Sequence, residues 1–328
     1  MTDPIFVLSP PRSFSSVVST ILGQHPELHT FPELQILWWD TIDQLLSART
    51  QTTQRRYAPP GLIRAIAFIH EQIQDSPSCA RACLWLSNNR SMTTAELFDY
   101  MRDAHAPLLC IEKSPSLSKS IDRLLRLFKL YPNAKFIHLT RSVLGNSKSL
   151  KEFFEHRDAE GISNSLTSHP LRSAQNYPLM WYGIHQNILK FRSIIPASNF
   201  LTVKGESILS NPHQVLPQIC RWLGISSDPL SIESMLHPEK SPYSFFGPAI
   251  AACGNDPKFI TSPQFRLMKK KPSTSDSVRQ YFDVEANSNF TEYFSRQTSD
   301  TSVLQQLKDY NHTIVDLILD TESQLGYV

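Results

Sequence analysis

The sequence predicts an α/β fold in which a parallel sheet is flanked by helices, with helical insertions and a long loop region towards the C-terminus. Short continuous apolar runs, typical of central parallel strands, alternate with segments whose apolar residues have helical spacing. Of the 328 residues, 41% are hydrophobic, which is enough to build a core. Alternating strands and helices favour a parallel sheet covered on both faces. Without internal repeats or a strong linker, residues 1–328 are expected to form a single domain.

The apolar runs and the periodic segments place the elements along the chain. Strands are expected at residues 5–8, 107–111, 135–139 and 200–203. Helices are expected at residues 15–22, 34–46, 62–73, 93–101, 118–130, 181–191, 216–223 and 304–325. Residues 242–271 are rich in Pro, Gly, Ser and Lys and follow neither pattern. We expect a long surface loop there, and such loops are often functional.

Composition narrows the classes of function. The formal net charge of +2 does not call for a nucleic acid as a partner. The N-terminus lacks a basic segment before its short apolar run, and no window has about 18 consecutive apolar residues, so neither a signal peptide nor a membrane span is expected. The five cysteines are scattered, as in proteins with reduced thiols, and no metal site is indicated. These features lead us to expect a cytoplasmic location.

A candidate phosphate site lies where the first strand leads into the first helix. The sequence Ser9-Pro10-Pro11-Arg12-Ser13-Phe14-Ser15-Ser16 forms a tight loop between the two elements. The N–H groups and the dipole at a helix start favour an anion, and an arginine adds a forked donor. The loop is P-loop-like in position, although the GxxxxGK[ST] pattern is absent. The alternative is a plain Ser/Pro turn with an N-capping serine.

A second candidate site follows the strand at residues 135–139. Arg141 leaves the carboxyl end of this strand, where open α/β sheets bind ligands. Ser149 comes eight residues later, about two helical turns on and on nearly the same helix face. The two side chains are therefore placed to hold a second phosphate. Taken singly, each residue is also explained as an ordinary surface side chain.

The order and spacing of these two segments resemble the sulfotransferase superfamily that uses adenosine 3′-phosphate 5′-phosphosulfate (PAPS). Its first motif, similar to SPPRSGST, cradles the 5′-phosphosulfate, and its second, similar to RDPxxxxxS, binds the 3′-phosphate. The resemblance implies that Arg12, Ser13, Phe14, Ser15 and Ser16 contact the phosphosulfate and that Arg141 and Ser149 contact the 3′-phosphate. It also implies that PAPS is the co-substrate and that adenosine 3′,5′-bisphosphate is a product.

The sequence departs from the family pattern at two places, and three further segments extend the resemblance. Phe14 replaces the usual loop glycine, and Ser142-Val143 replace Asp-Pro. The further segments resemble bacterial members, including sulfotransferases of natural-product pathways, so that the resemblance extends over most of the chain. They are residues 24–34, Ile111-Glu112-Lys113-Ser114-Pro115 and Gly254-Asn255-Asp256-Pro257-Lys258-Phe259.

Candidate catalytic residues are Glu33, Arg12 and Lys113. Glu33 follows Pro26 by seven residues, so one turn returns it to the cradle, and the resemblance implies a general base in such a Pro-Glu turn. A helix-start glutamate is the alternative. Arg12 and Lys113 would offset charge on the departing oxygen, although Lys113 is equally explained as a solvated loop lysine. His29 and His185 are the alternative bases.

The loop at residues 242–271 is the candidate lid. In the superfamily, a C-terminal loop with basic residues commonly closes over the nucleotide. Arg266, just before Lys269-Lys270-Lys271, is therefore a candidate contact to the nucleotide. A charge run more often marks a solvated face.

The predicted reaction is sulfuryl transfer to a hydroxyl or amine of a small molecule, such as a secondary metabolite, free or carrier-bound. Trp38, Trp39 and the segment Tyr243-Ser244-Phe245-Phe246 would line the acceptor pocket or pack in the core. Two alternatives stay open: a P-loop kinase of nucleotides or small molecules, and a degenerate nucleotide-binding module without catalysis. The absent Walker lysine counts against the first.

Overall fold

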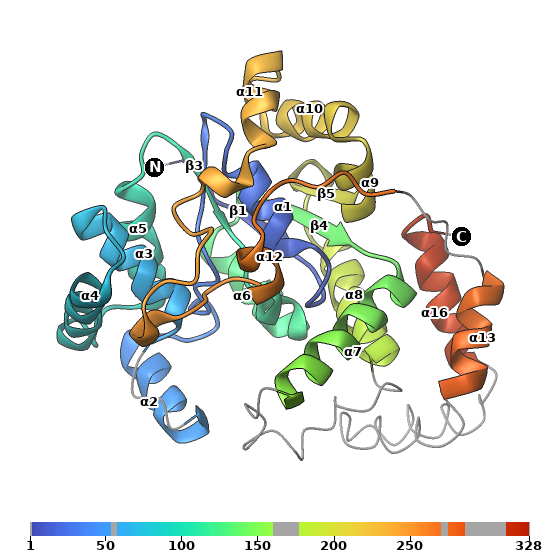
Figure 1. Cartoon of the computed structure of the whole chain (residues 1–328), viewed down its shortest axis with the longest axis horizontal. Coiled ribbons are helices and arrows are strands. Elements are labelled where there is room, and N and C mark those ends of the chain that lie inside the picture. Colours follow the sequence, from blue (N-terminus) through green and yellow to red (C-terminus); the bar gives the residue numbers. More distant parts are fainter. Residues whose placement is uncertain (1, 54–57, 160–176, 270–274, 286–312, 328) are drawn as a thin grey trace.

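The computed structural model describes residues 2–53, 58–159, 177–269, 275–285 and 313–327. Within these residues, five strands form one parallel sheet in the order β2-β3-β1-β4-β5 (Figure 1). The strands are β1 (Ile5–Leu8), β2 (Leu28–Thr30), β3 (Leu109–Glu112), β4 (Lys135–Thr140) and β5 (Phe200–Lys204). The predicted α/β fold is confirmed, and β2 is the one described strand that the apolar runs did not predict.

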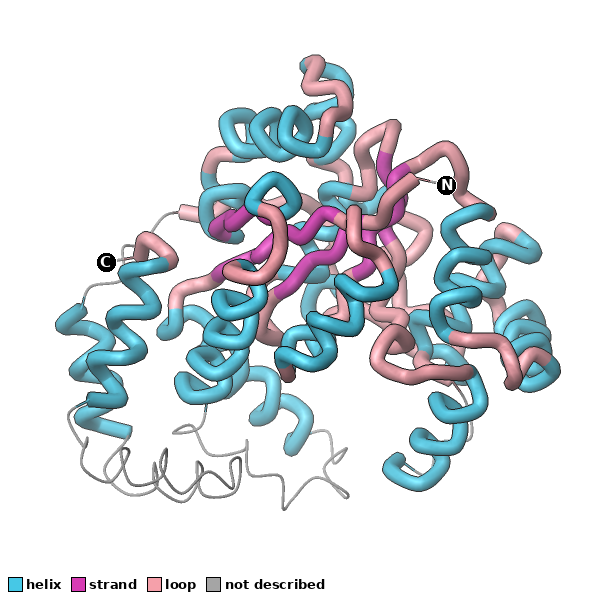
Figure 2. The backbone as a smooth tube through the Cα atoms, turned by 180° about the vertical axis from the view of Figure 1, so that it is seen from behind, coloured by secondary structure: helices cyan, strands magenta, loops and turns pink. Residues whose placement is uncertain are grey.

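Helices cover both faces of the sheet (Figure 2). Alternation along β1 sends Ile5 and Val7 to one face and Phe6 and Leu8 to the other. The first face packs against α1 (Ser15–Leu22), α9 (Gly205–Ser210), α10 (Pro212–Leu223) and α11 (Pro229–Met235). The second face packs against α3 (Pro60–Glu71), α5 (Thr94–Asp103), α6 (Ile121–Leu130) and α8 (Tyr177–Arg192).

The remaining helices flank these two layers. They are α2 (Ile42–Thr53), α4 (Ser76–Asn88), α7 (Val143–Ala159), α12 (Pro257–Thr261), α13 (Ser275–Glu285) and α16 (Thr313–Gln324). A third cluster of buried residues joins α7, α8, α13 and α16 beside the sheet. None of the helices in the described part of the chain is long and apolar enough to cross a membrane.

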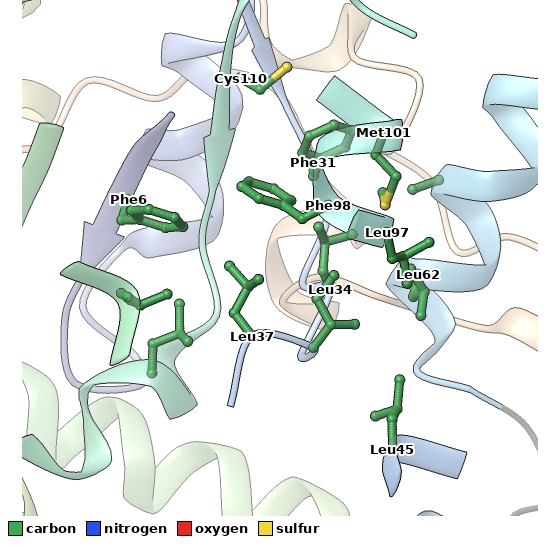
Figure 3. Packing of buried hydrophobic residues seen from close by; sticks show 14 of the residues in the cluster. Phe6, Phe31, Leu34, Leu37, Leu45, Leu62, Leu97, Phe98, Met101 and Cys110 are labelled. Atoms are coloured by element: carbon green, nitrogen blue, oxygen red, sulfur yellow. The ribbon is translucent and has the colours of Figure 1, made fainter. Parts of the chain in front are cut away.

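The helix predicted at residues 34–46 is wrong in its first half. The chain from Leu34 to Thr41 is not helical, and α2 begins only at Ile42. Leu34, Ile36 and Leu37 are nevertheless buried in the main core, where Leu34 and Leu37 lie close to Phe98 (Figure 3). Their spacing therefore reflects burial of an irregular segment rather than a helical face.

The predicted lid loop contains short helices. A 3₁₀ turn (Ala249–Ala251) and α12 interrupt it. In Figure 1 α12 lies in front of α1 and β1. Residues 270–271 of the predicted loop and residues 304–312 of the predicted closing helix lie outside the described residues, and the rest of that helix is α16.

The strand order brings the two candidate phosphate segments together. β1 pairs with β3 on one side and with β4 on the other, so the chain changes direction across the sheet at β1 and β4. Leu8 at the end of β1 is level with His138 in β4. The loop after β1 and Arg141 after β4 therefore leave the same edge at a topological switch point, where such sheets bind ligands.

Candidate active site

The loop between β1 and α1 has the tight geometry that the sequence predicts. Arg12 and Phe14 have φ values of 67° and 63°, the left-handed conformation that glycine adopts at least cost. Asn146 on α7 braces the loop, since its Nδ2 donates to the Pro11 carbonyl at 2.8 Å and to the Ser13 hydroxyl at 3.1 Å. The buried hydroxyl residues of the loop and the start of α1 are Ser9, Ser13, Ser15 and Ser16. The loop thus presents the first N–H groups of α1 at the sheet edge.

Arg12 has a carboxylate partner within the site. Its Nη1 donates to Asp256 Oδ1 at 2.5 Å, and its Nε donates to the Ser149 hydroxyl at 3.3 Å. The guanidinium also lies 5.1 Å from the ring centroid of Phe153. Arg12 and Ser149, predicted from separate segments, therefore lie together, and Asp256 neutralises the arginine.

Arg141 completes this group. Its Nη1 donates to the Arg12 carbonyl at 2.6 Å, and its guanidinium lies 4.1 Å from the ring centroid of Phe14. Burial lowers the pKa of Arg141 to about 10, and the nearby Glu206 carboxylate opposes that shift. The side chain remains a cation at neutral pH, fixed against the cradle loop.

Lys113 is the central cation of the site. Its side chain is 0% exposed and its Nζ donates to the Ser16 hydroxyl at 2.9 Å, to Glu33 Oε1 at 2.9 Å and to Asn255 Oδ1 at 3.0 Å. A buried ammonium needs all three of its protons accepted, and three separate segments supply the acceptors. Lys113 is therefore not a solvated loop lysine.

The turn that carries Glu33 is held on both sides. The Glu33 N–H donates to the Gly254 carbonyl at 2.8 Å, and the Gln35 N–H donates to the Ser114 hydroxyl at 3.0 Å. Gln35 has a φ of 56°. Glu33 keeps 25% of its side chain exposed, so its carboxylate is accessible while Lys113 fixes Oε1.

Glu112 is a buried carboxyl that the sequence did not single out. It accepts from the hydroxyl and the N–H of Ser114, which in turn holds the Glu33 turn through Gln35. Burial raises the pKa of Glu112 to about 7. The only sequence signal for this role was its place in the family-like segment Glu112-Lys113-Ser114.

Asn255 and Asp256 are the other contacts missed at the sequence level. Besides accepting from Lys113 and Arg12, this segment donates the Asp256 N–H to Ser16 at 3.1 Å. The segment was noted as family-like, but no role was attached to it. It crosses the cradle from the loop that was predicted to be a lid.

Arg266 and the two alternative histidines are not joined to this group by any contact in the described part of the chain. Arg266 donates to Ser262 within its own loop. The buried His185 pairs with His138 at 2.8 Å, and burial lowers the pKa of His185 well below its usual value. His29 stacks on a neighbouring ring, and burial lowers its pKa to about 3.

Of the aromatic residues predicted to line the acceptor pocket, some are buried and others are exposed. Tyr243 is buried, whereas Phe245 and Phe246 are exposed. Trp38 and Trp39 are partly buried against the main core. Among the described residues, no group of three or more His, Cys, Asp or Glu side chains is arranged to hold a metal ion.

Two solved structures with a similar fold are sulfotransferase domains. The sulfotransferase domain from the curacin biosynthetic pathway is 21% identical, covers 87% of this chain and 97% of its own, and superimposes with a TM-score of 0.65. The sulfotransferase domain from the Synechococcus PCC 7002 olefin synthase is 23% identical, covers 88% and 97%, and has a TM-score of 0.62. No curated protein matches the chain.

The family comparison covers most of the chain. The sequence model of the Sulfotransferase family matches residues 4–229, which include β1 to β5 and every site residue above except those of the lid loop. The sulfotransferase prediction is thus confirmed, and the comparisons give no support to the kinase alternative. The chain belongs to the sulfotransferase family.

Proposed function

We propose that the protein transfers a sulfuryl group from PAPS to a hydroxyl or amine of a small molecule and releases adenosine 3′,5′-bisphosphate. The observation that carries this proposal is the meeting of three groups at one sheet edge: the helix-start loop with Arg12, the side chains of Arg141 and Ser149 that each contact Arg12, and the Lys113–Glu33 ion pair. Two of these groups are suited to two separate phosphates, and the third is suited to proton transfer.

The binding roles follow from position. The N–H groups at the start of α1, with the hydroxyls of Ser13, Ser15 and Ser16, would hold the 5′-phosphosulfate. Arg141 and Ser149 would hold the 3′-phosphate. Arg12 belongs to the helix-start loop and contacts Ser149 and Arg141, so it would lie between the two phosphates.

The chemical step uses the Lys113–Glu33 pair. The acceptor oxygen or nitrogen forms a bond to sulfur, the bond from sulfur to the 5′-phosphate oxygen breaks, and the acceptor proton passes to the Glu33 carboxylate. Among the described residues, the second oxygen of Glu33 has only the distant Gln35 amide, 3.5 Å away, as a partner. Lys113 lies against Ser16, from where its charge stabilises the departing phosphate oxygen.

The class of acceptor is proposed from the structural neighbours. The two solved domains come from the curacin biosynthetic pathway and from an olefin synthase. We extend this to a small-molecule acceptor of a biosynthetic pathway, free or carrier-bound.

The experiment compares a nucleotide that has the 3′-phosphate with one that lacks it. Arg141→Ala should weaken binding of adenosine 3′,5′-bisphosphate by about 10- to 100-fold, since a hydrogen bond to a charged group contributes roughly 1.5–3 kcal/mol. Calorimetry with adenosine 5′-phosphosulfate, which lacks the 3′-phosphate, should show a much smaller change. Equal losses for both nucleotides would remove the 3′-phosphate assignment.

Glu33→Gln tests the catalytic half of the proposal. Turnover with PAPS and an acceptor should fall by about 10²–10⁴-fold while nucleotide affinity stays near that of the wild type. Stabilisation of the protein by ATP but not by PAPS in a melting experiment would instead favour a kinase. Near-full turnover of Glu33→Gln would exclude Glu33 as the base.

A further inference from the structure

The N-terminus of α7 is capped by two carboxylates from distant parts of the chain. Only Arg141 and Ser142 separate β4 from α7. The Ser142 N–H donates to Glu206 Oε1 at 2.9 Å, and the Val143 N–H donates to Glu322 Oε1 at 2.7 Å. These N–H groups have no partner within the helix, and negative charge is favourable there.

This capping explains the departure of the sequence from the Arg-Asp-Pro pattern. A proline at position 143 would have no N–H, whereas Val143 has one, and Glu322 accepts from it. The Ser142 hydroxyl accepts from the Gly145 N–H at 3.3 Å, within the same turn. The carboxylate that caps Val143 therefore comes from α16 instead of from the adjacent residue.

The end of the chain contacts both sides of Arg141. The Tyr327 hydroxyl donates to Glu206 Oε2 at 2.8 Å and shares a hydrogen bond of 2.9 Å with the Thr140 hydroxyl. Lys204 donates to the Gly326 carbonyl, and its ammonium lies 4.8 Å from the centroid of the Tyr327 ring. Thr140 precedes Arg141 and Val143 follows it, so the tail brackets the arginine.

The burial of Glu322 indicates a role other than stabilising the fold. Its side chain is fully buried, and its Oε2 has no hydrogen-bond partner among the described residues. An unpaired buried carboxylate oxygen costs free energy. The burial and the neighbouring Glu206 raise the pKa of Glu322 to about 7. Glu322 is therefore a candidate positioning residue, because its burial costs free energy and it caps Val143, two positions after Arg141.

We propose that Glu322 and Tyr327, at the C-terminal end of the chain, position Arg141 for the 3′-phosphate. Glu322 fixes the start of α7, and Tyr327 fixes Glu206 and Thr140. Together with the Trp181 indole, which donates to the Arg141 carbonyl at 2.8 Å, they hold the backbone on both sides of the arginine. This inference rests on the proposed function, because it assumes that Arg141 binds the 3′-phosphate.

Val143→Pro is the sharpest test. It installs the residue of the family pattern, and proline is tolerated at the first helical position, but it removes the N–H that Glu322 accepts. We expect the Kd of adenosine 3′,5′-bisphosphate to rise about tenfold, with less than a twofold change for adenosine 5′-phosphosulfate, both measured by calorimetry. Glu322→Leu should produce the same selective loss, whereas Glu322→Gln, which keeps an acceptor oxygen, should restore most of the affinity.

The double variant and a matched control complete the design. The double variant Val143→Pro, Glu322→Leu should lose no more affinity than either single variant, because both changes remove the same hydrogen bond. Asp316→Asn, which breaks the exposed ion pair of α16 with Arg279, should leave both affinities unchanged. Tyr327→Phe should show the selective loss in a milder form.

The outcomes separate this inference from the proposed function. A wild-type protein with no preference for the 3′-phosphorylated nucleotide would overturn both. A clear wild-type preference that persists in Val143→Pro and Glu322→Leu would overturn the positioning role alone. Equal weakening of both nucleotides would also overturn it, since the contacts would then serve only the fold.

Discussion

Phe14 occupies the position where the family pattern has a glycine, and the structure supplies a packing reason for it. The residue keeps the left-handed backbone of a glycine, with a φ of 63°. One side of its ring meets the Arg141 guanidinium. A Cβ added to Gly205 would lie 2.5 Å from Phe14 Cδ2, so the aromatic ring fills the space above that glycine. The substitution in the loop is therefore matched by a glycine in α9.

Phe14→Gly should weaken nucleotide binding even though it relieves the strain of a left-handed backbone at this position. Loss of the ring removes a cation–π contact worth about 0.5–2 kcal/mol and frees the Arg141 side chain. We expect the Kd of adenosine 3′,5′-bisphosphate to rise about fivefold. Calorimetry measures this, and a melting curve checks the fold. Unchanged or tighter binding would show that Phe14 is merely tolerated.

At the scale of elements, the segment from Gly254 to Lys258 links the lid loop to the catalytic turn. Its contacts with Lys113, Arg12 and the Glu33 N–H come from consecutive residues. The buried Arg64 of α3 anchors this loop, since it donates to the carbonyls of Phe245 and Cys253. This loop is thus held by α3 on one side and by residues at the sheet edge on the other.

Asp256→Asn should strengthen nucleotide binding. The Asp256 carboxylate pairs with Arg12, where an incoming phosphosulfate needs that cation. The amide keeps the acceptor for the Lys258 N–H that starts α12 but removes the competing charge. A partly exposed ion pair contributes up to about 1 kcal/mol, so affinity for adenosine 3′,5′-bisphosphate should rise about fivefold. Glu71→Gln, which breaks the exposed pair with Arg81, is the control. Weaker binding in Asp256→Asn would mean that Asp256 orients Arg12.

The helix α3 meets the Glu33 turn through a glycine. A Cβ added to Gly61 would lie 2.3 Å from the Glu33 carbonyl oxygen, and a Cβ on Gly254, at a φ of 85°, would lie 2.9 Å from the Gly61 Cα. Backbone on both sides leaves no flexible side chain to give way. The approach of these two glycines therefore sets the position of Glu33.

Gly61→Ala should displace the Glu33 turn and lower turnover by at least about tenfold, with a fall in stability of about 1–3 kcal/mol. Gly183→Ala is the matched control, because Gly183 is exposed in α8 and an added Cβ meets nothing within 4 Å. That control should be neutral or more stable by up to about 1 kcal/mol. Steady-state kinetics and urea unfolding measure both, and equal behaviour of the two variants would contradict the packing argument.

At the scale of the whole molecule, buried histidines dominate the response to acid. Burial lowers the pKa of His29 and His138 to about 3, that of His105 to about 4 and that of His185 well below its usual value. Below pH 6.5 the unfolded chain therefore binds more protons than the folded one, and stability is lost as pH falls. Glu112 and Glu322, whose pKa values are raised to about 7, act in the opposite sense between pH 7 and 4.5.

Replacing His138 and His185 together by leucine should flatten this acid response. The pair is fully buried and joined by one hydrogen bond, so removing both rings leaves no lone partner. Urea unfolding at pH 7.5, 6 and 5 should show a loss of stability with falling pH in the wild type and a clearly smaller loss in the double variant. An unchanged slope would mean that these histidines do not titrate on unfolding.

The sequence by itself determined the central strands and the residues at their carboxyl ends. Continuous apolar runs predicted β1, β3 and β4 inside the sheet and β5 at one edge, since strands covered by helices on both faces are rich in apolar residues. Strand β2, with the sequence Leu28-His29-Thr30, lies at the edge of the sheet and carries no such run. Arg12 and Arg141 could be placed at one sheet edge because each follows a predicted strand directly.

Only the tertiary structure decided the partners of those residues. Lys113 finds its acceptors 97, 80 and 142 positions away, in Ser16, Glu33 and Asn255. Glu322 caps a residue 179 positions away. Such long-range contacts leave no periodic pattern in the sequence. The buried segment before α2 even has the apolar spacing of a helix although it is irregular. A buried charge takes whichever acceptor the packed chain brings within reach, and the fold, rather than the local sequence, fixes that choice.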